Sequence, residues 1–190
     1  DDEIVCGMYG LVNIDSGVSA TVILNGGKYS ADTDNGAFIK VRPGAKDVNI
    51  TLNNVTYVDS SNDGFVLNKS GYNGTMNLTI NGGTFTANAG FQVINGTIEG
   101  GATFNTKAYA FEITGNTTIK NCTINVGSAT VSSAPAAAVA VSNGGTATVT
   151  GCTITCNETP SVYAVYSTGG TINRSNNTVS GTYDSEYVEY

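Results

Sequence analysis

Histidine and tryptophan are absent from this sequence, and among its 190 residues lysine and arginine together number only eight. Without histidine, a catalytic triad or proton relay that depends on imidazole cannot form. With so few basic residues against a formal net charge of -7, no basic patch is available for phosphate backbones or anionic lipid. We therefore expect no nucleic-acid partner and no histidine-based catalysis.

Long apolar runs are absent as well. No segment approaches the roughly 20 apolar residues that a membrane helix needs, and the start, DDEIVCGMYG, has neither the basic nor the apolar region of a signal peptide. We expect no membrane insertion. Little lysine together with abundant threonine, serine, asparagine and glycine is typical of secreted or cell-surface bacterial proteins, so the expected location is extracellular.

Helix-favouring residues are scarce, whereas 40% of the residues are hydrophobic and only 12% are charged. A chain this apolar is not expected to be disordered, and its 24 glycines indicate many turns. Its length suits one domain. The composition therefore favours a single all-β domain over residues 1–190.

A repeated pattern runs through most of the chain, which is the sequence signature of a solenoid. An aliphatic residue, a turn-like polar pair, a small residue and a second large apolar residue recur with spacings of 18–30 residues. The repeats read LNGGKY, LNNVTY, INGGTF, IEGGATF, IKNCTI and VTGCTI. We expect equivalent residues of successive repeats to stack about 4.8 Å apart, as neighbouring hydrogen-bonded strands do.

Three apolar columns follow from the repeat. The first comprises Leu24, Leu52, Ile80, Ile98, Ile119 and Val149. The second comprises Tyr29, Tyr57, Phe85, Phe104, Ile124, Ile154 and Val179. The third comes from period-two strands, most of which end in a glycine turn, such as Val12 and Ile14, Ile39 and Val41, Phe65 and Leu67, and Tyr163 and Val165.

The columns predict an all-β parallel β-helix, a β-solenoid with three short strands in each coil. We expect about seven coils of 18–30 residues, an N-terminal cap over 1–10 and a partial last coil over 185–190. Crossover chirality favours a right-handed helix. An unpaired strand at the C-terminal edge would favour end-to-end or side-by-side self-association.

The repeat resembles the right-handed parallel β-helix repeats of the pectate-lyase-like superfamily and of the bacterial surface proteins and adhesins built on it. The resemblance covers nearly the whole chain, but it implies only the fold, because this solenoid carries lyases, hydrolases, adhesins and inert stalks. In the enzymes of the family, catalytic acids and basic groups stand on the outer face of a stacked sheet or on loops beside it.

Catalytic acids or basic groups would therefore be expected on the outer face of the glycine-terminated strands. Its predicted column comprises Asn13, Lys40, Val66, Gln92, Glu112, Ala140 and Ala164. Hydrolysis of a glycosidic bond needs two carboxyl groups about 5–9.5 Å apart, and this column offers only Glu112. Arg42 is expected to join a charge ladder with Asp15 and Lys69 rather than to act in catalysis.

Aspartates form the strongest acidic cluster, in the turns DTDNG and DSSNDG of adjacent coils. They are Asp32, Asp34, Asp59 and Asp63. Stacked carboxylates suit Ca²⁺, the one cofactor that the sequence suggests. The simpler interpretation is that these aspartates form the turns.

Tyrosines outside the apolar columns are the candidate ligand contacts, because an exposed ring stacks on a sugar or a partner surface at little entropic cost. The candidate binding residues are Tyr9, Tyr72, Tyr109, Tyr166 and Tyr183, together with Glu112.

Threonines form an outward ladder that resembles the surface of ice-binding solenoids. The ladder comprises Thr56, Thr84, Thr103, Thr123, Thr153 and Thr178. The neighbouring column is mixed, since Val58 and two asparagines interrupt it, so ordinary exposed strand residues are the simpler interpretation.

Three cysteines, Cys122, Cys152 and Cys156, fall on inward positions. They are expected to form a stack of buried thiols, or Cys122 and Cys152 are expected to form a disulfide between neighbouring coils. Cys6 has no expected partner. A zinc site would need all four cysteines, because histidine is absent.

The resulting expectation is a non-catalytic secreted or cell-surface protein. It would serve in adhesion by binding a polysaccharide or a host protein, or act as a structural stalk. The alternative is a polysaccharide lyase or glycoside hydrolase that uses Glu112 and the turn aspartates. Ice binding is a more remote alternative.

Overall fold

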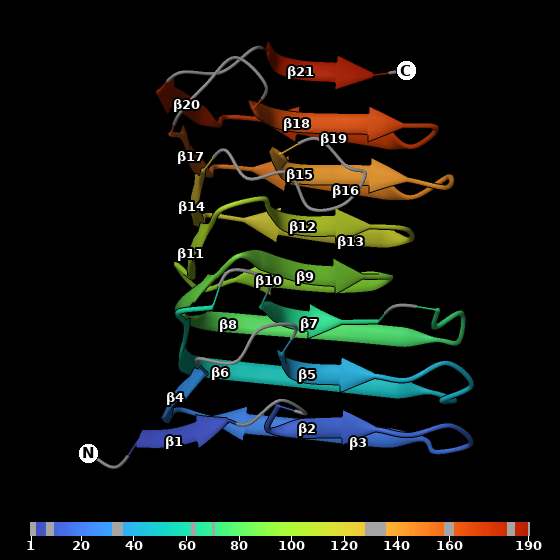
Figure 1. Ribbon diagram of the computed structural model, residues 1–190. Coiled ribbons are helices and arrows are strands. Elements are labelled where there is room, and N and C mark those ends of the chain that lie inside the picture. Colours follow the sequence, from blue (N-terminus) through green and yellow to red (C-terminus); the bar gives the residue numbers. More distant parts are fainter. Residues whose placement is uncertain are drawn as a thin grey trace.

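The structure is a computed structural model that describes residues 3–6, 10–31, 36–61, 64–69, 71–127, 136–157, 162–181 and 185–189. All regular structure in these ranges is β-strand, and every strand pairing is parallel. The strands stack as a β-solenoid in which β1 and β21 lie at opposite ends (Figure 1). The all-β solenoid predicted from the repeat is confirmed.

The larger sheet of 13 strands is bent into two arms. The first arm contains β3 (Ala20–Asn25), the first half of β6 (Val48–Asp59), the first half of β8 (Met76–Ala87), β10 (Asn95–Glu99), β13 (Asn116–Lys120), β16 (Thr146–Thr150) and β19 (Thr171–Ser175). The second arm contains β1 (Glu3–Cys6), β4 (Lys28–Ala31), the second halves of β6 and β8, β11 (Thr103–Thr106), β14 (Thr123–Val126), β17 (Thr153–Cys156) and β20 (Thr178–Gly181).

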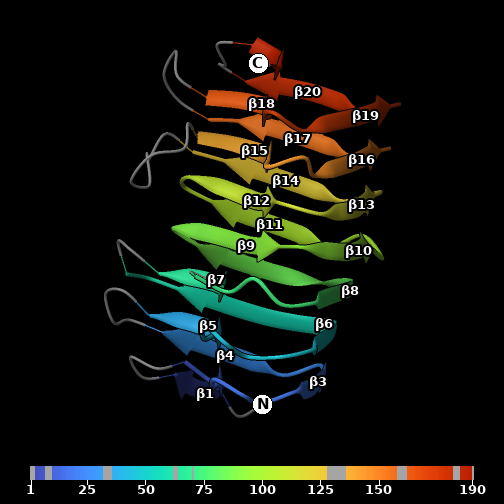
Figure 2. The same ribbon diagram turned by 90° about the vertical axis from the view of Figure 1, so that its right-hand side faces the viewer.

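The second sheet has eight strands. In order along the solenoid they are β2 (Val12–Ile14), β5 (Ala37–Val41), β7 (Phe65–Asn68), β9 (Ala89–Val93), β12 (Tyr109–Ile113), β15 (Ala136–Ser142), β18 (Val162–Thr168) and β21 (Ser185–Glu189). Figure 2 shows the strands of each sheet stacked in columns along the solenoid axis. The final strand expected at the C-terminal end is thus present as β21, paired with β18.

The solenoid has about six turns, slightly fewer than the seven coils predicted. The first arm holds seven strands from β3 to β19, so the chain rises six times between the first and the last of them. The predicted number counts the coils themselves, whereas the number of turns counts the steps from one coil to the next. None of the described segments is a helix of the length and apolar character needed to cross a lipid bilayer.

The first two predicted core columns are confirmed by the strand register, whereas the third is shifted by two residues in two coils: Ile39 pairs with Leu67 and not with Phe65, and Val139 pairs with Val165 and not with Tyr163. Leu52 pairs with Leu24 and Ile80, and Tyr57 pairs with Tyr29 and Phe85. The aromatic rings stack from coil to coil: the ring centroids of Phe85 and Phe104 are 5.5 Å apart and nearly parallel. Burying these columns is the main source of stability, since each fully buried large side chain contributes about 1.5–3 kcal/mol.

The bend between the two arms has at least one residue with positive φ in each coil from β3 to β19. This explains the polar pair in the repeat, because only glycine and asparagine adopt that conformation without a large cost. The residues at the bend are Gly26, Asn54, Gly82, Gly100, Asn121, Gly151 and Asn176. Gly27, Gly83 and Gly101, the extra residue of the fourth repeat segment, also have positive φ.

The second sheet corrects two predicted positions. Lys40 pairs with Asn68 and not with Val66, and Ala140 pairs with Tyr166 and not with Ala164. Val66 and Ala164 are fully buried. Strict alternation fails in these strands because two consecutive side chains, such as Val66 and Leu67, both face the core.

Candidate functional site

The outward-facing side chains of the second sheet form one mainly polar column that contains two of the predicted binding residues, Glu112 and Tyr166. This outer column comprises Asn13, Lys40, Asn68, Gln92, Glu112, Ala140 and Tyr166. Its members come from consecutive strands of one sheet, so their spacing is fixed by the backbone hydrogen bonds between coils. The column is therefore a rigid surface that runs along the solenoid axis.

Gln92 and Glu112 form the centre of the outer column. The side-chain amide Nε2 of Gln92 donates to Oε2 of Glu112 over 3.0 Å, and the backbone N–H of Lys69 donates to Oε1 of Gln92 over 2.8 Å. The amide is thus held at both ends. Burial lowers the pKa of Lys69, and the nearby Glu112 carboxylate partly offsets this effect. A cation, an amide and a carboxylate are brought together here.

Tyr109 lies three residues before Glu112 on β12, but its ring is not displayed for stacking. It is 3% exposed and packs with Ala89, Ala108 and Phe65 in a small apolar cluster outside the main core. Burial raises the pKa of Tyr109, and the Glu112 carboxylate raises it further. The exposure predicted for Tyr109 is wrong, and its ring is not available to stack on a ligand.

Tyr163 and Tyr166 carry the aromatic surface of this face. Their ring centroids are 5.3 Å apart with an interplanar angle of 41°, and both side chains are half-buried. In the strand register Ala140 separates Tyr166 from Glu112. The face therefore places the Glu112 carboxylate two strands away from a pair of aromatic rings.

Tyr72 is a second correction, because it is buried and not exposed. Its hydroxyl donates to the carbonyl oxygen of Thr75 over 2.6 Å and also contacts the carbonyl of Lys46. The ring closes the turn that leads into β8. Tyr9 and Tyr183 lie outside the described residues.

The acidic turns are described at Asp59, while Asp32, Asp34 and Asp63 lie outside the described residues. Asp59 is 5% exposed; its Oδ2 accepts from the hydroxyl of Tyr57 over 3.0 Å and its Oδ1 from the backbone N–H of Ser61 over 2.8 Å. Within the described ranges no three acidic, cysteine or histidine side chains are grouped to hold a metal ion. Asp59 thus serves to close its own turn.

The charge ladder predicted for Arg42 is present in part. Nε of Arg42 lies 3.1 Å from Oδ1 of Asn13 and 3.8 Å from Oδ1 of Asp15. Lys69 does not extend this ladder, because it lies near Glu112 instead. The Arg42 contacts hold the first strands of the outer column together.

The threonine ladder of the second arm is in register as predicted, from Thr56 to Thr178. The structure adds a polar array on the first arm that the sequence analysis missed. A second threonine ladder runs along its middle: Thr51, Thr79, Thr97, Thr118 and Thr148. Asparagines flank this ladder, and Nδ2 of Asn81 donates to Oδ1 of Asn53 over 2.8 Å. The alternation NITLN and NLTIN is the signal that could have revealed it.

The cysteines are buried free thiols. Cys122 and Cys152 occupy consecutive rungs, and a hydrogen bond between the two thiols, together with burial, raises the pKa of Cys122. Burial also raises the pKa of Cys156 to about 11. These shifts favour the protonated, unreactive form of Cys122 and Cys156.

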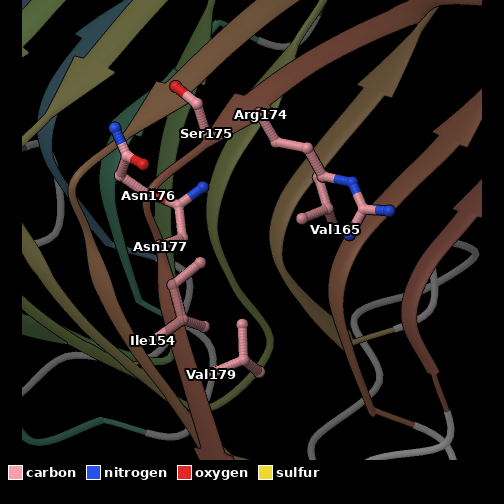
Figure 3. Close-up of a pocket in the computed structure, with 7 residues that line it drawn as sticks. All are labelled: Ile154, Val165, Arg174, Ser175, Asn176, Asn177 and Val179. Atoms are coloured by element: carbon pink, nitrogen blue, oxygen red, sulfur yellow. The ribbon is translucent and has the colours of Figure 1, made fainter.

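A hollow of about 330 Å³ lies at the last turns of the solenoid. Figure 3 shows the aliphatic side chains of Ile154 and Val179 together at the bottom of the view, and Val165 next to Arg174 above them. Ile154 and Val179 belong to the second core column, and no described strand stacks above β20. The hollow is therefore the end of the core column and not a pocket built around a ligand.

Comparisons with protein-family models, with curated proteins and with solved structures found no match to this chain. The fold assigns it to the parallel β-solenoids as a class.

Proposed function

We propose that the protein is a non-catalytic, secreted or cell-surface β-solenoid that binds polysaccharide along the outer column of its second sheet. The observation that carries the proposal is the Gln92 and Glu112 pair on the same rigid face as the Tyr163 and Tyr166 rings, with strand β15 between Glu112 and Tyr166. The repeat's resemblance to bacterial surface adhesins agrees with this function.

A sugar presents hydroxyl groups at its edge and C–H groups on its faces, and the second sheet offers side chains that can contact each of them. The hydroxyl groups bind amides, carboxylates and ammonium groups, as found in Gln92, Glu112 and Lys69, and the C–H faces stack on tyrosine rings. Because Gln92 is fixed at both ends of its amide, little side-chain entropy is lost on binding. A preorganised polar row with an aromatic end suits a chain that lies along the solenoid.

Binding is favoured over cleavage because this face has too few carboxylates for glycosidic hydrolysis. The outer column from Asn13 to Tyr166 holds one carboxylate, Glu112, and glycosidic hydrolysis needs a second within about 5–9.5 Å. Hydrolysis or elimination would therefore have to recruit a second group from elsewhere in the chain.

The proposal is tested by electrophoresis of the pure protein through gels cast with plant, microbial and host polysaccharides, with each gel also assayed for cleavage products. We expect retardation without cleavage, and less retardation for Tyr166→Ala. Thr148→Ala, on the first arm of the larger sheet, is the matched control and should migrate as the wild type does. Cleavage products would overturn the non-catalytic assignment, and absence of retardation in every gel would favour a host-protein partner or a structural stalk.

The threonine ladders favour ice binding as a second candidate. Two ladders in register present hydroxyl and methyl groups at strand spacing on the larger sheet. Charged side chains beside the first arm's ladder, Glu99 and Lys120, disturb its regularity. Thermal hysteresis measured on a growing ice crystal, lost in Thr97→Lys, would replace the polysaccharide proposal; its absence would leave that proposal unchanged.

A further inference from the structure

Two of the four buried thiols occupy equivalent positions in neighbouring coils. Cys122 directly precedes β14 and Cys152 directly precedes β17, and these two strands pair in register from Thr123 and Thr153 onward. The backbone N–H of Thr153 donates to the carbonyl oxygen of Cys122 over 2.9 Å, so the pairing reaches the cysteines. Both cysteine side chains are buried in the core. They are therefore adjacent members of one inward column.

The two thiols also have the same orientation. Sγ of Cys122 lies 3.3 Å from the carbonyl oxygen of Lys120, and Sγ of Cys152 lies 3.5 Å from that of Thr150. Paired residues on neighbouring strands are about 4.8 Å apart, within the range of about 4.4–6.8 Å that Cα atoms have in disulfides. The preferred Cβ separation is shorter, about 3.8 Å, so a bond would draw β14 and β17 slightly closer together.

Cys152 is the more reactive of the two thiols. The hydrogen bond from Cys122 lowers the pKa of Cys152 to about 7, although burial acts in the opposite direction, and the same hydrogen bond raises the pKa of Cys122. The thiolate is the form that attacks an oxidant. We therefore expect Cys152 to react first, with Cys122 beside it to complete a disulfide.

The hollow at the last turns of the solenoid gives a route to Cys152. Asn177 lines the hollow and directly precedes β20, which pairs with β17, so it is the next member of the inward column after Cys152. Its Oδ1 accepts from the backbone N–H of Cys152 over 2.9 Å, and its Nδ2 donates to the carbonyl oxygen of Val149 over 2.9 Å. The thiol of Cys152 is therefore one side chain away from the hollow.

We propose that Cys122 and Cys152 are a redox-sensitive pair, which a peroxide oxidises to a disulfide between two neighbouring coils. The thiolate of Cys152 attacks one oxygen of the peroxide and the O–O bond breaks; Cys152 becomes a sulfenic acid, and the other oxygen takes up a proton and leaves as water or an alcohol. The thiol of Cys122 then attacks the sulfenic sulfur, which forms the S–S bond and releases water. The pair is oxidised and the peroxide is reduced. The proposal does not depend on polysaccharide binding.

The test treats the reduced, folded protein with hydrogen peroxide and then digests it without reduction for mass spectrometry. We expect a peptide linked through Cys122 and Cys152, loss of two of the four free thiols and no covalent dimer. The urea midpoint of the oxidised protein should rise, because a cross-link between coils restricts the unfolded chain. Dithiothreitol should return the midpoint to its initial value.

Three variants separate this pair from general oxidation. Cys122→Ala should abolish the rise in urea midpoint. Cys156→Ala removes another buried thiol of the same arm and should keep both the linked peptide and the rise. Asn177→Ala uncovers Cys152 from the hollow and should speed the loss of free thiols several-fold.

The wild type alone can overturn the proposal, so the test stands even if a variant does not fold. A linked peptide from any other pair of cysteines, four free thiols retained under peroxide, or oxygen added to Cys152 without a linked peptide would each overturn the redox pair. An unchanged rate of thiol loss in folded Asn177→Ala would overturn entry through the hollow.

Discussion

The hydroxyl of Tyr57 donates to Oδ2 of Asp59 over 3.0 Å at the end of β6, where both side chains are buried. Asp59 also accepts the backbone N–H of Ser61, and a Cβ at Gly64 would lie only 1.7 Å from Oδ2 of Asp59. The turn between the larger and the second sheet is therefore built around one carboxylate.

Asp59→Ala should lower the free energy of unfolding by about 1–3 kcal/mol, because the hydroxyl of Tyr57 is left buried without an acceptor. Urea unfolding followed by circular dichroism measures the loss. Asp15→Ala is the control: this residue is 70% exposed, and its replacement should change stability by less than about 0.5 kcal/mol. An unfolding midpoint for Asp59→Ala equal to that of the wild type would contradict the structural role of this carboxylate.

Alkaline pH should destabilise the fold through its buried tyrosines. Burial, and then the neighbouring carboxylates Asp59 and Glu112, raise the pKa of Tyr57 and Tyr109 above the ordinary value of 10.0. The folded state holds these protons more tightly, so the stabilisation is complete below pH 10 and is lost as pH rises above it.

Urea midpoints measured at increasing pH above neutrality should therefore fall once pH passes 10. The fall should be smaller in the Tyr57→Phe and Tyr109→Phe variants, which have no phenolic proton to lose. If both variants lose stability as steeply as the wild type, other groups control the alkaline transition.

Phe91→Ala should be among the most damaging single changes, at about 3–5 kcal/mol. The ring is fully buried, stacks on Phe111 at a centroid distance of 5.8 Å and meets Phe85 edge-on at 5.2 Å. Its removal leaves a cavity between the rings of Phe85 and Phe111. Thermal unfolding measures the effect against Val58→Ala, an exposed site where little change is expected.

Asn121→Val should cost about 1–2 kcal/mol, since valine is strained at a φ of 54°. Asn121→Gly should be tolerated, because glycine occupies the same bend in other coils, as at Gly82 and Gly151. Chemical denaturation of the two variants gives the comparison. Equal stability of Asn121→Val and Asn121→Gly would show that the bend does not demand positive φ.

The core was predictable because its signal is repeated. Residues such as Leu52 and Ile80 recur at equivalent places, and each coil adds independent support for the same register. The second sheet was less predictable at β7 and β18, because two consecutive residues face the core there and a period of two cannot represent that arrangement.

The candidate site was predictable only in part, because exposure depends on what packs from other coils. Glu112 and Tyr166 were correctly placed in the outer column. Tyr109 is instead covered by Phe65 and Ala108. Tyr72 is buried because its hydroxyl contacts the backbone carbonyls of Lys46 and Thr75.

The hydrogen bonds between coils, such as Val48 N–H to the carbonyl of Thr75 and Thr153 N–H to the carbonyl of Cys122, all run along the solenoid axis. Tension applied along that axis would act on all of these ladders in series, and the terminal coil, whose strands β1 and β2 have a neighbour on one side only, would detach first. Tension across the axis would instead be carried by covalent backbone within each strand. A filament of this construction is stiff to sideways load and releases its length in discrete steps when it is stretched.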